Sequence, residues 1–154
     1  MTTQTADGSS SAPDDSRFGR FLLVFFAGVA PWSIQTYVSG SVTFLFAWGL
    51  FTPSPVSLTT ITDFFFRFTR GLPEYILVWP LGVACYLVAL AGVTSGLLFD
   101  REDVRLTVAG LVCAGLTQLE VARGFSVQPG RTAWPLGTVL LWAVAGYLYW
   151  SRKR

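Results

Sequence analysis

The polar side chains best placed to do chemistry lie near the end of a long apolar stretch. Gln118 and Glu120 are followed by Arg123, one helical turn after Glu120. Ionisable groups at membrane depth are costly, so they are by default candidates for an ion or substrate path. The simpler hypothesis, which we favour, is a surface ion pair between Glu120 and Arg123. Gln118 would then bond a neighbouring helix.

A second group of charged residues follows a phenylalanine-rich segment. Arg67, Arg70 and Glu74 lie within eight positions of one another. Two arginines on one surface are suited to hold a lipid phosphate or the acidic surface of a partner protein. The alternative is that these charges face water and Asp63. We take the three residues as candidates for lipid or partner binding.

The chain lacks the residues that most catalytic sites use. There is no histidine, and the two cysteines, Cys85 and Cys113, lie in separate apolar runs. A Ser-His-Asp triad is therefore excluded, and the usual zinc ligand sets are too. The glycine-rich stretches lack the lysine of a phosphate-binding loop. We expect a protein that is not an enzyme, with no catalytic residues, metal or cofactor. Whether the two cysteines lie close together stays open.

The composition is that of a membrane protein with one domain. Of the 154 residues, 52% are hydrophobic and only 13% are charged, against about 25% charged in soluble domains. The formal net charge of +2 is too small to suggest a nucleic-acid partner. These values predict an all-α membrane protein in the cell membrane.

Apolar runs divide the chain into four predicted transmembrane helices, each long enough for a hydrocarbon core of about 30 Å. They cover residues 20–38, 74–99, 104–122 and 133–150. Residues 1–19 are rich in Ser, Thr and Asp and are predicted to be a disordered tail. Residues 151–154 form a basic C-terminal tail. The domain of four helices therefore covers residues 20–150.

A short amphipathic helix is predicted at residues 58–70. Its phenylalanines fall on one face, and Asp63, Arg67 and Arg70 fall on the other. Thr60 and Asp63 have the spacing of a capping box. The segment is too short and too charged to cross a bilayer, so we expect it to lie in the membrane interface.

The segment before it, residues 41–56, has a different period. Large apolar residues alternate with smaller ones from Ser41 to Leu50, which is closer to a strand than to a helix. A lone strand in lipid would leave its backbone unpaired. We therefore expect an outer loop packed against the helices, with a re-entrant hairpin as the alternative.

Two further patterns concern packing and orientation. Gly92 and Gly96 form a GxxxG pattern, which lets a second helix approach closely. With the N-terminus inside, the inner segments carry seven Lys and Arg residues and the outer segments four. This difference favours a multi-pass protein with both termini in the cytoplasm.

Several short motifs recur in one order along residues 20–150. They are Pro31-Trp32, WGLFTPSP at 48–55, FTRGLP at 68–73, WPLG at 79–82, PGRTAWPLG at 129–137 and YLYW at 147–150. In these motifs the chain resembles a family of small, uncharacterised haloarchaeal membrane proteins. The resemblance implies a multi-pass membrane protein from a salt-loving archaeon, and it implies no activity.

The leading hypothesis is thus a non-enzymatic membrane protein. It would act through contacts with membrane lipid, with another membrane protein or with a second copy of itself. The alternative is a small transporter or channel subunit that works as an oligomer, with Thr117, Gln118 and Glu120 along its path.

Overall fold

The computed structural model describes residues 12–67, 71, 74–99, 101 and 103–152. These residues form five helices and five strands. The helices are α1 (Ala12–Val29), α2 (Ile61–Arg67), α3 (Glu74–Phe99), α4 (Val104–Ser126) and α5 (Leu136–Ser151). The strands are β1 (Ser33–Tyr37), β2 (Val42–Leu45), β3 (Gly49–Pro53), β4 (Val56–Thr60) and β5 (Arg131–Trp134).

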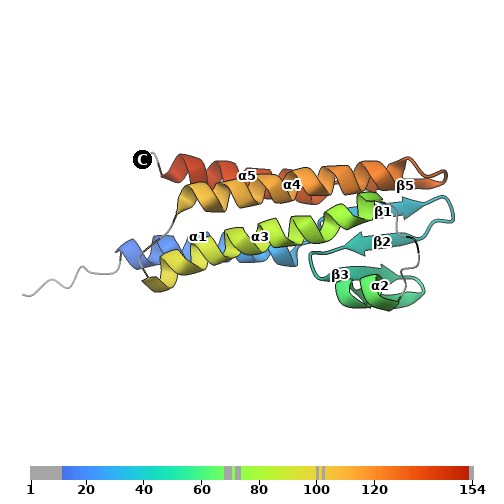
Figure 1. Cartoon of the computed structure of the whole chain (residues 1–154), viewed down its shortest axis with the longest axis horizontal. Coiled ribbons are helices and arrows are strands. Elements are labelled where there is room, and N and C mark those ends of the chain that lie inside the picture. The colour runs from blue at the N-terminus through green and yellow to red at the C-terminus, as the bar shows by residue number, and fades with distance from the viewer. Residues whose placement is uncertain (1–11, 68–70, 72–73, 100, 102, 153–154) are drawn as a thin grey trace, which may run out of the picture.

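The molecule is elongated, with helices along most of its length and a sheet at one end. Helices α1, α3, α4 and α5 run along the long axis (Figure 1). The start of α1, the end of α3, the start of α4 and the end of α5 lie at the end opposite the sheet (Figure 1). The short helix α2 lies beside the sheet.

The sheet is antiparallel throughout, with the strand order β4-β3-β2-β1-β5. The first four strands follow one another along the chain. The fifth comes from the segment between α4 and α5 and pairs with β1, where Gln35 lies opposite Ala133. This pairing ties the C-terminal half of the chain to the N-terminal half.

The core of the bundle is closed by aromatic side chains whose polar atoms are all bonded to the backbone. Trp32 donates from Nε1 to the carbonyl oxygen of Ala27 at 2.8 Å, and the Tyr86 hydroxyl donates to that of Val24 at 3.0 Å. The two rings meet edge to face, with centroids 5.5 Å apart. Gly28 makes room for this arrangement, because a Cβ there would overlap the Tyr86 hydroxyl.

The all-α prediction is wrong, and the five-stranded sheet overturns it. The helix predicted at 20–38 ends at Val29, and residues 33–37 are strand β1. Pro31 accounts for the end of the helix, since it lacks an N–H and its ring clashes with the preceding turn. The alternating pattern at 41–56 was a true strand signal. It belongs to β2 and β3, whose backbones pair with neighbouring strands rather than standing alone.

The prediction of four transmembrane helices is also wrong. In the described part of the chain, only α3 and α4 are long and apolar enough to cross a membrane. The predicted helix 133–150 instead divides into β5 and the 16-residue α5, which is about 24 Å long. The prediction of 74–99 coincides with α3, and the one at 104–122 continues to Ser126.

The predicted interfacial helix at 58–70 begins as strand, and its residues 68–70 lie outside the described residues. Strand β4 ends at Thr60, and α2 covers Ile61–Arg67. The capping box is confirmed, because Thr60 Oγ1 accepts from the backbone N–H of Asp63 at 3.2 Å and donates to its carboxylate at 2.9 Å. Phe64 and Phe65 pack on Trp79 rather than forming an outward stripe. At the N-terminus, α1 begins at Ala12, inside the segment predicted to be a disordered tail.

Candidate functional site

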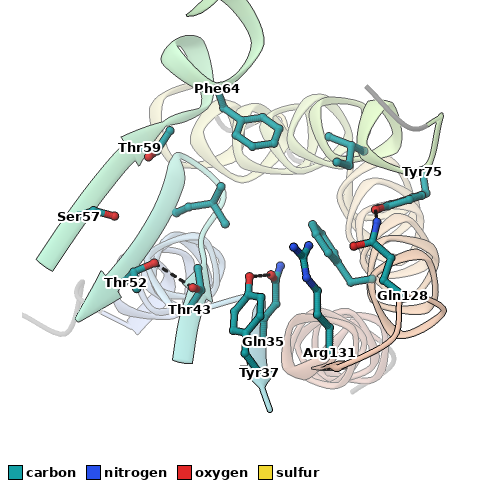
Figure 2. A pocket seen from close by; sticks show the side chains of 13 residues that line it. Gln35, Tyr37, Thr43, Thr52, Ser57, Thr59, Phe64, Tyr75, Gln128 and Arg131 are labelled. Carbon is teal, nitrogen blue, oxygen red and sulfur yellow. Dashed lines mark hydrogen bonds between the residues drawn. The ribbon is translucent and has the colours of Figure 1, made fainter. Parts of the chain in front are cut away.

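An open cleft of about 530 Å³ lies between the inner face of the sheet and the sheet-side ends of α2, α3 and α4. Figure 2 looks into it. A row of polar side chains crosses four strands on its sheet side: Gln35, Thr43, Thr52 and Ser57. The register aligns them, since Gln35 lies opposite Thr43 and Thr52 opposite Ser57. Thr43 and Thr52 are hydrogen-bonded at 2.9 Å.

The opposite wall of the cleft is largely apolar. It is made by Phe64 of α2, Ile76 of α3 and Phe125 of α4. Below them lies a buried cluster that contains Trp79, whose Nε1 donates to the carbonyl oxygen of Phe46 at 3.2 Å. Leu50, Phe64 and Phe125 pack against this cluster and also line the cleft, so the cluster joins the sheet to the helices beside the cleft.

One further polar pair stands on the helix side. Gln128, just beyond the end of α4, donates from Nε2 to the hydroxyl of Tyr75 at 2.6 Å. The Tyr75 ring packs edge to face on Phe125, with centroids 5.4 Å apart. The bond fixes both side chains at the edge of the cleft (Figure 2).

The only cation among the described residues that line the cleft is Arg131 of β5. It lies opposite Tyr37 in the sheet, and its guanidinium carbon is 5.2 Å from the centre of the Tyr37 ring. The Tyr37 hydroxyl donates to Oε1 of Gln35 at 3.1 Å. Gln35 is 2% exposed, and its Nε2 has no partner within the described chain. Figure 2 shows the Arg131 and Gln35 side chains pointing into the cleft.

The cleft therefore offers hydrogen-bond donors beside an apolar wall. None of the described lining residues is acidic. In the part of the chain that the structure describes, no group of three or more His, Cys, Asp or Glu residues could hold a metal ion. The arrangement is suited to binding an electron-rich group rather than to moving a proton or attacking a substrate.

The candidates in the bundle do not share one surface. Gln118 is fully buried, and neither atom of its amide has a partner in the described structure. Glu120 is exposed and pairs with Arg123, with 3.4 Å between the charged groups. The predicted surface ion pair is confirmed, whereas no partner helix bonds Gln118 within the described residues.

The two described candidates from the charged group do not line the cleft. Arg67 pairs with Asp63 at 3.7 Å. Glu74 is exposed at the start of α3. Arg70 lies outside the described residues. Neither Arg67 nor Glu74 lines the cleft, so their predicted role in lipid or partner binding stays a prediction.

The glycines of α3 lie at a helix contact. Gly92 and Gly96 are both buried, and a Cβ on Gly92 would lie 2.5 Å from Oγ1 of Thr107 on α4. At Gly110 of α4 the backbone of α3 itself is close, since a Cβ there would lie 2.7 Å from the carbonyl oxygen of Cys85. Cys85 and Cys113 are both free thiols. Their side chains are close enough to hydrogen-bond across the contact between α3 and α4.

The cleft residues were missed in the sequence for an identifiable reason. Gln35 and Tyr37 fell inside a predicted helix, and Arg131 was counted only for its charge in a loop. A partial signal was present, because polar and apolar residues alternate over Ser33–Gln35 and again over Val56–Thr59. Alternate residues of a strand share one face, so such segments place their polar side chains together.

The fold and the cleft define a class of protein: a helical bundle whose end is covered by an antiparallel sheet with an open binding cleft. The chain belongs to the DUF8050 family, a domain of unknown function, whose sequence model matches residues 1–154. This match confirms that the chain belongs to an uncharacterised family. A comparison with curated proteins finds no match.

Proposed function

We propose that this protein is an integral membrane protein of the cell membrane that acts through contacts with lipid or another membrane protein, without catalysis. The observation that carries the proposal is the apolar outer surface of α3. Its exposed side chains include Leu77, Leu81, Leu87, Val88, Leu98 and Phe99. Only 39% of its most apolar stretch is buried within the protein. A helix that is apolar on every side belongs inside a core or a membrane.

The dimensions of two helices support this proposal. Helix α3 has 26 residues and α4 has 23, which gives lengths of about 39 and 35 Å. Both exceed the hydrocarbon core of about 30 Å. We therefore propose α3 and α4 as the two spans, with the sheet outside the bilayer. Exposed side chains such as Phe26 of α1 and Val139 of α5 extend the apolar surface.

The charge distribution supports an orientation. Arg101, Arg105 and Arg152 line one depression at the end of the bundle opposite the sheet, with Asp103 as its acidic residue. Positively charged residues are enriched on the cytoplasmic side of membrane proteins. We place this end, where α3 ends and α4 starts, in the cytoplasm (Figure 1). The cleft then opens on the outer side. A salt-loving archaeal source remains part of the proposal through the resemblance of the motifs.

The transporter or channel alternative has weaker support. It requires Gln118 and Glu120 to line one path, but the first lies inside the bundle and the second on its exposed surface. Their different environments favour the proposal that the protein acts through contacts.

The proposal is tested by placing a charge at the middle of α3. Leu87 is 54% exposed there. In lipid, Leu87→Arg should cost about 2.5–3.5 kcal/mol and reduce the amount of protein in alkaline-washed membranes. On a water-facing surface it should change stability by less than about 0.5 kcal/mol.

The matched control is Val38→Arg. Val38 is more exposed than Leu87 but lies beside the sheet, so its substitution should leave membrane insertion unchanged. Equal insertion of the two variants, or release of the parent protein by alkaline carbonate, would refute the membrane proposal.

A further inference from the structure

We propose that the cleft binds a small amphipathic anion, with a carboxylate or phosphate headgroup held by Arg131 and Gln35 and an apolar body against the helix wall. This inference rests on the proposed function and deepens it, because it names the chemistry of the molecule that is contacted. Three features of the cleft support it: an unpaired donor, an unpaired charge and an apolar wall.

The unpaired donor is Nε2 of Gln35. The side chain is 2% exposed, and the Tyr37 hydroxyl already occupies its oxygen. The group left without a partner among the described residues is therefore an N–H donor. A buried donor without a partner is costly, and a ligand oxygen in the cleft would satisfy it.

The unpaired charge is the guanidinium of Arg131. Within the described residues it makes no ion pair, and its one recorded contact is the Tyr37 ring. Gln35 lies opposite Ala133, two positions along β5 from Arg131. Gln35 and Arg131 are thus diagonal neighbours on one face of the sheet, within reach of a single headgroup. The planar guanidinium matches the two oxygens of a carboxylate or phosphate.

The apolar wall determines the rest of the ligand. Leu50, Phe64, Ile76 and Phe125 line the cleft together with the polar row. The volume of about 530 Å³ falls within the range of about 300–1,000 Å³ typical of small-molecule sites. An inorganic ion would leave the apolar wall uncovered, whereas an alkyl or aryl group would cover it. This chemistry is shared by anionic membrane lipids and by free organic anions.

The test uses hexyl phosphate and hexanoate as probes, with the full chain in phosphatidylcholine nanodiscs and binding measured by calorimetry. Both probes should bind, and uncharged hexanol should bind far more weakly. Arg131→Gln should weaken the binding of both anions by about tenfold or more, the usual effect of losing a charge-assisted hydrogen bond. Arg123→Gln is the matched control, because Arg123 is exposed and paired outside the cleft, and it should bind as the parent does.

A second variant separates binding from folding. Gln35→Glu keeps the shape of the side chain and places a carboxylate beside Arg131, in the position of the ligand's headgroup. Its thermal stability should be close to that of the parent, and anion binding should be lost. Any of three outcomes would overturn the proposal. They are unchanged anion binding in both Arg131→Gln and Gln35→Glu, binding of hexanol as tight as that of the anions, and no binding of either anion.

Two arms of the experiment distinguish the sources of the ligand. If hexyl phosphate binds less well in nanodiscs that contain phosphatidylglycerol, the occupant is a lipid headgroup. Equal binding in both nanodiscs assigns the cleft to a free organic anion. Failure of the anion-binding proposal is seen in the calorimetry. Failure of the membrane proposal is seen separately, in the extraction by alkaline carbonate. If carbonate released the protein, the same titration would be made in buffer.

Discussion

Helices α3 and α4 are in close contact at glycines, where no side chain keeps the two helices apart. The sheet and the helix ends next to it are instead separated by the open cleft. Each region contains a buried glutamine without a partner for its amide nitrogen in the described structure: Gln118 in the bundle and Gln35 in the cleft. Only Gln35 lines the open cleft. The same unpaired amide therefore lies inside the helix bundle in one region and in the wall of an open cleft in the other.

The two regions meet at Trp79, and its removal should have the largest effect on stability. Trp79 is 2% exposed and bonded to the backbone at Phe46. Trp79→Ala should cost about 3–5 kcal/mol, because the cavity would open beneath the sheet. Thermal unfolding in mild detergent, followed by near-UV circular dichroism, measures this loss. The control is Trp134→Ala, at a tryptophan that is 59% exposed. A similar loss in both variants would mean that the regions are not joined at this point.

The next largest effect on stability should come from the contact between α3 and α4. A Cβ on Gly110 would lie 2.7 Å from a backbone oxygen of α3, which cannot turn away as a side chain can. Gly110→Leu should therefore destabilise the protein by about 1–3 kcal/mol. Gly146→Leu on α5 is the control, since a Cβ there has no atom within 4 Å. Gly92→Leu should destabilise less than Gly110→Leu, because it meets the hydroxyl of Thr107.

The helix bundle and the cleft also differ in how much of each could be predicted from the sequence. Helix α3 was predicted to its ends, since it is one uninterrupted apolar run between Glu74 and the charged residues at 100–103. Local signals also sufficed for the capping box and for the pair between Glu120 and Arg123. The cleft was not predicted, because it depends on strand partners that are distant in the sequence. Nothing local to Arg131 indicates that it pairs with Tyr37 across more than ninety residues.

The smallest effects should occur at α2, where the cap and the ion pair can be compared. Thr60 satisfies a backbone N–H at the start of the helix, and its loss in Thr60→Ala should cost about 1 kcal/mol. Arg67 forms an exposed pair with Asp63, with the two side chains 77% and 44% exposed. Water and salt screen such a pair, so Arg67→Gln should cost at most about 0.5 kcal/mol.

Thermal unfolding of both α2 variants at low and high salt measures the difference. The cost of Thr60→Ala should be the same at both, because a cap bonds at short range to a fixed backbone N–H. The cost of Arg67→Gln should vanish at high salt. A cost for Arg67→Gln that exceeds that of Thr60→Ala would mean that α2 is held by charge rather than by its cap. Helix α2 would then depend on a cation, as we propose for ligand binding in the cleft, and not on short-range contacts as the helix bundle does.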